Sequence, residues 1–134
     1  MGYEILPHTA DFRIRAWGKT HEELFADSLR GMSSVMRPEA REQSPTVTRD
    51  VSVASADTVA LLIDFLSEAL SLAEIHKEIY TDVQFHEFDG RSLRAAIRGL
   101  PVPEFSEDVK AVTYHGAEIR KADRGYEVTV TYDV

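Results

Sequence analysis

Hydrophobic and polar positions alternate with a period of two in several short stretches of the chain. Phe12, Ile14 and Ala16 alternate with arginines at 13 and 15, which predicts a half-buried strand. Similar patterns or β-rich composition predict further strands at 3–6, 46–53, 79–88, 92–100, 109–120 and 126–134. The dipeptide Asp89-Gly90 between two of these stretches is typical of a hairpin turn.

A helical period begins after Thr20. Thr20 and Glu23 have the spacing of a capping box, in which each side chain accepts a hydrogen bond from a free backbone N–H at a helix start. The apolar residues that follow, at spacings of four, three and four, form one helix face: Phe25, Leu29, Met32 and Met36. We expect this first helix to end at Pro38.

A second helix is predicted from Ser55 or Asp57 to about Lys77. It is apolar around most of its circumference, and only Asp64, Glu68 and Ser71 form a narrow polar stripe. A helix of this composition should be the central buried element. Because strands precede and follow only two helices, the order of elements favours the α+β class over a doubly wound fold.

The length of 134 residues suits one domain, 1–134. The chain has 15 Lys and Arg against 23 Asp and Glu, a formal net charge of −8, which argues against a dedicated nucleic-acid binder. It has no cysteine, so disulfides, zinc–thiolate sites and cysteine nucleophiles are excluded, and a reducing cytoplasm suits it. We recognise no signal peptide or membrane span, and expect a soluble protein.

Signatures of common enzymes are absent from the sequence. It has no Gly-rich phosphate loop, no Gly-x-Ser-x-Gly and no His-Glu-x-x-His, and its five histidines share no zinc spacing. His8 with a serine or aspartate would need a partner geometry that nothing in the sequence supplies. We therefore assign no catalytic residue.

Three carboxylates are candidates for a shared site: Asp11, Asp133 and Glu68. Each also has an ordinary interpretation, since Asp11 could close a turn and the other two could be solvated. If they converge, a divalent cation would relieve their repulsion, and oxygen ligands select calcium, magnesium or manganese over zinc or copper. Spacing cannot show convergence, because 122 residues separate Asp11 from Asp133.

Basic residues offer two further candidates. Lys110 shares a strand face with Val112 and Tyr114, so it either extends its ammonium into water or lies beside carboxylates in a site. The second candidate is a local basic group, for which an exposed strand face is the default interpretation and contact with an acidic partner or RNA the minority one: Arg91, Arg94 and Arg98.

The chain resembles the archease family along essentially its whole length. The resemblance rests on the opening run Tyr3-Glu4-Ile5-Leu6-Pro7-His8-Thr9-Ala10-Asp11, on Val109-Lys110-Ala111-Val112-Thr113-Tyr114-His115, and on the closing Tyr132-Asp133-Val134. It implies a single small domain, a mixed β-sheet with two packed helices. It also implies a cytoplasmic, non-catalytic activator of the RtcB-type RNA ligase of tRNA splicing, which promotes the metal-dependent guanylylation and multiple turnover of the ligase.

The same resemblance assigns residues. Asp11 and Asp133 correspond to the family's ligands for a divalent cation. Lys110, Glu68 and His8 are the residues that we expect to act in activation or partner contact. The chain departs from many archeases at Ser71, where an aromatic residue is common, and in the short, proline-rich stretch before the second signature.

Two other functions stay open at this stage. The first is a chaperone-like modulator of another RNA-processing enzyme, such as a tRNA methyltransferase, which would bind its partner without depending on the acidic residues. The second is a stand-alone metal-dependent enzyme, which would turn over substrate unaided. Stable nucleic-acid binding by the chain itself is not expected.

Overall fold

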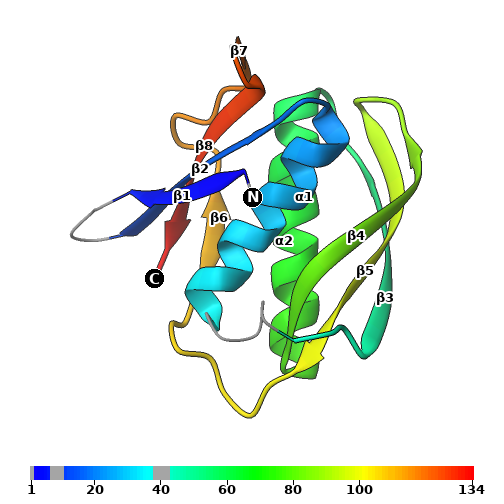
Figure 1. Ribbon diagram of the computed structural model, residues 1–134, viewed down its shortest axis with the longest axis vertical. Helices are drawn as coiled ribbons and strands as arrows, with labels where there is room; N and C mark the ends of the chain where they lie inside the picture. Colours follow the sequence, from blue (N-terminus) through cyan, green and yellow to red (C-terminus); the bar gives the residue numbers. More distant parts are fainter. Residues whose placement is uncertain (1, 7–10, 38–42) are drawn as a thin grey trace.

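A computed structural model describes residues 2–6, 11–37 and 43–134 of the chain (Figure 1). The elements follow in the order β1 (Tyr3–Leu6), β2 (Asp11–Gly18), α1 (His21–Met36), β3 (Val47–Ala54), α2 (Thr58–His76), β4 (Glu78–Phe88), β5 (Ser92–Pro101), β6 (Ala111–Thr113), β7 (Arg120–Ala122) and β8 (Gly125–Asp133). The predicted α+β class with two packed helices is confirmed.

The described strands form two sheets in which every neighbouring pair is antiparallel. The first sheet has the order β1-β2-β8-β6, and β7 also pairs with β8; the second has the order β3-β5-β4. The long strand near the start of the chain, β2, therefore pairs with the strand that ends it, β8. This pairing decides where the candidate site lies.

Both helices pack against strands from the two sheets, as Figure 1 shows. Helix α1 contacts β1, β2 and β8 together with β4, whereas α2 contacts β3, β4 and β5 together with β6. The side chains of Leu61, Phe65 and Leu66 on α2 are completely buried, but Glu68, Ser71 and Ile75 on the same helix are exposed. A larger share of α1 is buried, so the prediction that α2 is the central buried element is wrong: one side of α2 packs in the core and the other faces outward. Within the described residues, no helix is long and apolar enough to cross a membrane.

The helix ends follow the signals in the sequence. The Thr20 hydroxyl accepts a hydrogen bond from the Glu23 N–H at 3.1 Å, and the Glu23 carboxylate accepts one from the Lys19 N–H at 2.7 Å. Asp57, the second of the two caps considered for α2, accepts from the Ala60 N–H at 2.8 Å. Pro38, expected to stop α1, lies outside the described residues, and α1 itself ends at Met36.

The strand predictions are confirmed within two residues except in the stretch 109–120. There, only β6 and the first residue of β7 are in strands, and the backbone turns between them, where the Ala117 N–H donates to the Tyr114 carbonyl at 3.0 Å. Gly116 in this turn has φ +67°, a conformation that favours glycine. A single long strand was therefore the wrong interpretation of this stretch.

An ion pair between a half-buried arginine and a buried glutamate links the two outer strands of the second sheet across β5. Arg49 on β3 donates to both carboxylate oxygens of Glu78 on β4, at 2.9 and 2.8 Å, and the Tyr80 hydroxyl donates to the same carboxylate at 2.7 Å. Glu78 is only 4% exposed. The hydrogen bonds from Arg49 hold the pKa of Glu78 below its usual value, more strongly than burial raises it. This carboxylate is fully engaged within the chain.

Candidate functional site

Asp11 and Asp133 face each other across neighbouring strands. Asp11 begins β2, Asp133 ends β8, and the two residues are directly paired in the antiparallel register. Side chains in such a pair lie on one face, with Cβ atoms about 4.5–5.5 Å apart. The structure therefore brings together two carboxylates that lie 122 residues apart in the sequence.

The face that carries this pair is turned away from the core. Ile14 and Ala16 on β2, and Val128 and Val130 on β8, are buried and occupy the opposite face, because side chains alternate along a strand. Asp133 is exposed and Asp11 is half-buried. Two like charges placed opposite each other repel, and water at an exposed face only partly screens that repulsion.

Lys110 contacts Asp133 through a backbone hydrogen bond. Its N–H donates to the Asp133 carbonyl at 2.8 Å, and the next residue, Ala111, pairs with Asp133 from the other side of β8. Lys110 therefore lies just before β6. Within the described residues, the exposed Lys110 side chain makes no ion pair.

Glu68 does not join the acidic pair. It is an exposed residue on α2, one helical turn after Asp64. Asp64 accepts hydrogen bonds from the Ser55 hydroxyl at 2.6 Å and from the Tyr114 hydroxyl at 3.3 Å. The polar stripe of α2 thus includes a structural link to the end of β6, and Glu68 is solvated beside it.

Asp11 also lines a hollow on the same face. The hollow has a volume of about 400 Å³, and its other lining residues come from β2, from β8 and from the turn after β6: Arg13, His115, Gly116, Thr129 and Thr131. These side chains supply a guanidinium, an imidazole and two hydroxyls. The acidic pair therefore borders a polar recess.

The two aspartates suit a hard cation, because all their donor atoms are oxygens. Two carboxylates supply two to four of the six to eight ligands that calcium takes, so waters or a partner would supply the rest. Within the described residues, no group of three or more His, Cys, Asp or Glu side chains could hold a metal ion. His8, the other expected partner contact next to Asp11, lies outside the described residues.

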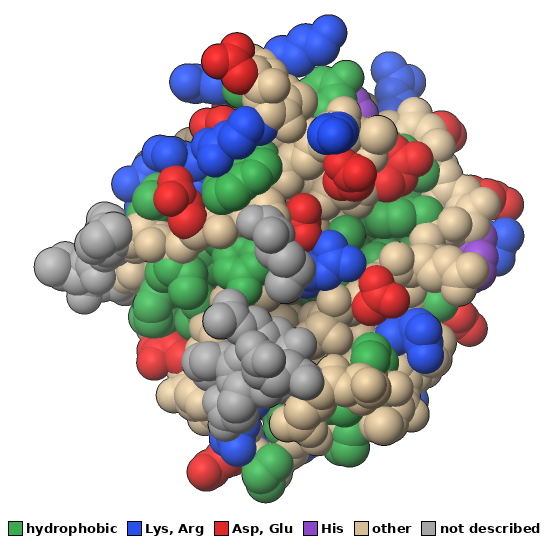
Figure 2. Space-filling model, viewed as in Figure 1, with side chains coloured by type: hydrophobic (Ala, Val, Ile, Leu, Met, Phe, Trp, Pro, Cys, Tyr) green, Lys and Arg blue, Asp and Glu red, His purple; other side chains and the backbone are tan. Residues whose placement is uncertain are grey.

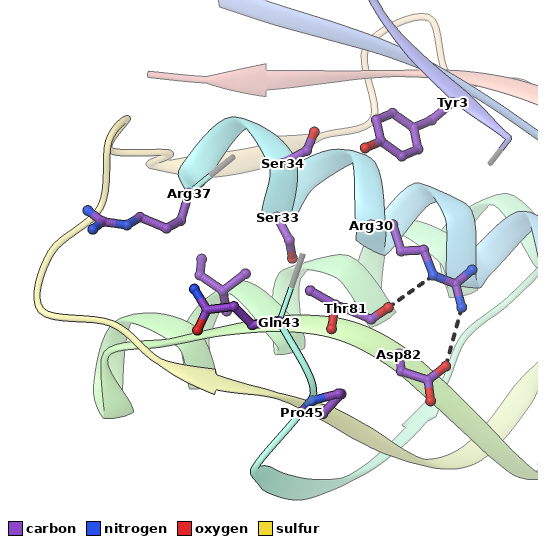
Figure 3. A pocket seen from close by; sticks show the side chains of 10 residues that line it. Tyr3, Arg30, Ser33, Ser34, Arg37, Gln43, Pro45, Thr81 and Asp82 are labelled. Carbon is purple, nitrogen blue, oxygen red and sulfur yellow. Dashed lines mark hydrogen bonds and ion pairs between the residues drawn. The ribbon is translucent and has the colours of Figure 1, made fainter. Parts of the chain in front are cut away.

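A different pocket, of about 250 Å³, lies between α1 and β4 (Figure 3). Arg30 crosses it and donates to the Thr81 carbonyl at 3.0 Å and to the Asp82 carboxylate at 3.3 Å. Asp27 also accepts from this guanidinium at 2.8 Å. Because Arg30 already has three acceptors and none of the candidate site residues lines this pocket, we do not assign the function to it.

The basic group of β5 is exposed. Arg94 pairs with Glu87 at 3.2 Å, with both side chains more than half exposed, and Arg91 and Arg98 are exposed as well. Surface pairs of this kind contribute little to stability. The default interpretation of this group as an exposed strand face agrees with the structure.

Apart from Asp11, the residues that line the hollow were not predicted as site residues from the sequence. Thr129 and Thr131 were not singled out from the sequence, Arg13 was only a polar position of a predicted strand, and His115 was only part of the run from Val109 to His115. The alternation of β2 and β8 was a signal that they share a face with Asp11 and Asp133. Only the register of the two strands, together with the turn at Gly116, shows that they surround one recess.

Comparisons with known proteins agree on one family. The sequence model of the Archease protein family (MTH1598/TM1083) matches residues 3–134. A protein archease from Methanosarcina barkeri is 34% identical, with 98% of this chain and 95% of the relative covered. One from Thermococcus gammatolerans is 35% identical, with 92% and 91% covered.

Two solved structures are similar over nearly the whole chain. The solution structure of Methanobacterium thermoautotrophicum protein 1598 has a TM-score of 0.81 and 30% sequence identity, with 99% of each chain covered. The crystal structure of a Thermotoga maritima protein described as an archease, possible chaperone, has a TM-score of 0.66, with 98% of this chain and 96% of that chain covered. At 17% identity, the second likeness concerns the fold.

Proposed function

This chain belongs to the archease family, and from that premise we propose that it is a cytoplasmic, non-catalytic activator of an RtcB-type RNA ligase in tRNA splicing. It promotes the metal-dependent guanylylation of the ligase and so allows multiple turnover. The chain itself performs no ligation, in keeping with the absence of the enzyme signatures considered above.

One observation carries the proposal: the pairing of Asp11 with Asp133 on an outward face. The two side chains supply the oxygens that hold a divalent cation. The β2–β8 and β6–β8 pairings fix the backbone on both sides of Asp133, including the hydrogen bond from Lys110, so the two aspartates are held opposite each other without a cation. When bound, the cation supplies positive charge and open coordination positions.

The remaining site residues act on the partner. Lys110 is exposed at the same sheet end as the aspartates, where its ammonium can meet an acidic group of the ligase. Glu68 offers a carboxylate on the neighbouring helix, and His8 belongs to the segment that leads into Asp11. In this arrangement Lys110 meets the ligase at the sheet end that carries the cation site, and Glu68 meets it from α2.

The test measures guanylylation of the cognate ligase at limiting amounts of this protein. Asp11→Asn and Asp133→Asn should each abolish activation, because each removes half of the anionic ligand set at nearly constant volume. Asp50→Asn is the matched control, since Asp50 is an exposed strand aspartate in the other sheet. Full activation by both site variants would contradict the proposal.

Lys110 can be tested separately from folding. Lys110→Ala should retain the wild-type melting temperature and lose activation, because only its backbone bonds to β8. Lys121→Ala, at another exposed lysine in β7, serves as the control. An unfolded Lys110→Ala variant would refute a role in activation alone.

The alternative, a chaperone-like modulator of another RNA-processing enzyme such as a tRNA methyltransferase, is suggested by the description of the Thermotoga maritima protein as a possible chaperone. Binding of unfolded chains requires a contiguous apolar surface. In the described part of the chain, the large apolar side chains that are exposed number three: Ile5, Ile75 and Tyr114. A methyltransferase captured equally well with and without chelator, and a ligase unaffected by this protein, would favour the alternative.

A further inference from the structure

The hollow beside Asp11 continues along the outer face of the first sheet. A second hollow, of about 260 Å³, adjoins it and shares Arg13, Gly116 and Thr129 with it. Together the two hollows form one recess. It runs along β2 and β8 from Asp11 and is also lined by the turn between β6 and β7. Figure 2 shows Lys and Arg side chains gathered over the end of the sheet where β7 and β8 lie.

Most arginines of this face already have carboxylate partners. Arg15 pairs with Glu4 at 2.8 Å. Arg120 pairs with Glu118 at 3.0 Å, and Arg124 pairs with Glu127 at 3.5 Å. Arg13 differs: it is exposed and makes no ion pair or side-chain hydrogen bond within the described residues. Its guanidinium, with five N–H donors in a planar fork, is available to an anion.

The surroundings of Arg13 supply further donors. Thr131 on β8 is directly paired with Arg13 on β2, and Thr129 is paired with Arg15. Both hydroxyls therefore lie on the same face of the sheet as Arg13. His115 and Gly116 cover the recess from the turn. Apart from Gly116 itself and its two chain neighbours, no atom lies within 4 Å of the position that a Cβ would take at Gly116, so a ligand can approach the backbone there closely.

We propose that this recess binds the phosphate group of a small phosphate monoester of mononucleotide size, with Arg13 as the bidentate anchor. A guanidinium fork matches two phosphate oxygens, and the threonine hydroxyls and imidazole complete the donor set. The carboxylate of Asp11 at one end repels phosphate and accepts hydrogen bonds from hydroxyl groups, so it orients a ligand that carries both. The net charge of −8 disfavours a long polyanion.

This site goes beyond the proposed activation of a ligase and does not depend on it. The binding groups are side chains of this chain alone, and no cation is needed. The experiment is therefore performed in the presence of EDTA on the isolated protein, so a failed phosphate site leaves the activation proposal standing, and the reverse also holds.

The experiment is an amide NMR titration with AMP and, separately, with inorganic phosphate. We expect saturable shifts at Gly116, Thr129 and Thr131 with both probes. Arg13→Gln should weaken binding about tenfold or more, the usual loss when a charge-assisted hydrogen bond is removed. Arg13→Lys keeps the charge without the fork and should fall in between.

Arg98→Gln is the matched control, because Arg98 is an exposed strand arginine in the other sheet without an ion pair in the described part of the chain. It should bind AMP as the wild type does. Asp11→Asn should tighten phosphate binding, since it removes a nearby negative charge.

Three results would overturn the inference. The first is the absence of saturable shifts at these three amides. The second is equal affinity in the wild type and Arg13→Gln. The third is a ten-nucleotide RNA that binds more tightly per phosphate than AMP and shifts amides well beyond the recess, which would make the ligand a nucleic-acid strand.

Discussion

The two sheets of this protein treat carboxylates in opposite ways. In the second sheet, Glu78 is buried, and its oxygens accept hydrogen bonds from Arg49 and Tyr80. In the first sheet, Asp11 and Asp133 are paired with each other on an outward face. Glu78 is neutralised by Arg49, whereas Asp11 and Asp133 place two like charges on neighbouring strands.

This difference separates a stabilising group from one that costs stability. A buried carboxylate with matched donors contributes to the folded state, although its desolvation offsets part of the gain. Opposed carboxylates on neighbouring strands destabilise the fold by about 0.2–1 kcal/mol. Proteins keep arrangements expected to lower stability mainly at functional sites, which is consistent with the cation site that we propose for this pair.

The substitution with the largest expected effect on stability is Glu78→Ala. It removes three hydrogen bonds and leaves the Tyr80 hydroxyl buried without its acceptor, so we expect a loss of about 3 kcal/mol in the free energy of unfolding. Urea denaturation measures this loss. A change below about 0.5 kcal/mol would show that the ion pair is not stabilising.

Addition of a divalent cation should stabilise the protein through the aspartate pair and leave Glu78 unaffected. If Asp11 and Asp133 bind it, a concentration of about one hundred times Kd should stabilise the wild type by about 2.7 kcal/mol. Thermal unfolding with calcium, magnesium or manganese, and again after EDTA, measures this gain. Asp133→Asn should lose the gain and Asp50→Asn should keep it; equal gains in all three proteins would place the cation elsewhere.

A fall in pH tests the contribution of the Glu78 charge to the free energy of unfolding, because protonation removes the charge and keeps the side chain in place. The pKa of Glu78 is lowered in the folded state, chiefly by Arg49. Its contribution to stability is therefore complete above the pKa of an unfolded glutamate, about 4.3, and is lost as pH falls through the lower folded pKa. In Glu78→Gln, unfolding free energy measured below pH 5 should fall less steeply than in the wild type.

The smallest expected effect is the change in stability when the repulsion between Asp11 and Asp133 is removed in the absence of a cation. Asp133→Asn should stabilise the protein in EDTA by about 0.2–1 kcal/mol, because it removes the repulsion with Asp11. The stabilisation should shrink at high salt, which screens exposed charges. A destabilised variant whose loss is independent of salt would mean that the Asp133 carboxylate has a structural role.

Local signals in the sequence predicted most of the fold. The period of two over β2 and β8, the capping threonine of α1 and the apolar circumference of α2 each reflect interactions between residues close in sequence. The failure at 109–120 has a local cause as well: Gly116 with φ +67° lies in a stretch whose apolar residues resemble those of a strand, and the turn divides it.

For the candidate site, the sequence offered residues but no geometry. Asp11, Asp133 and Lys110 were singled out, and the register now places their backbones together. Glu68 was grouped with the carboxylates, but it is exposed on α2 and apart from them. Arg13 was not singled out at all, because a polar residue on an amphipathic strand resembles any other solvated side chain until its neighbours are known.

Element types, the apolar helix faces and the candidate acidic residues could be predicted from the amino-acid sequence, because periodicity and capping depend on neighbours a few positions away. The folded chain was needed to show that Asp11 faces Asp133, that Glu78 is neutralised by Arg49, and that Arg13 lines a recess. Each of these depends on strand register between distant segments. Register is set by the packing of the apolar face as a whole, which no single stretch of the chain encodes.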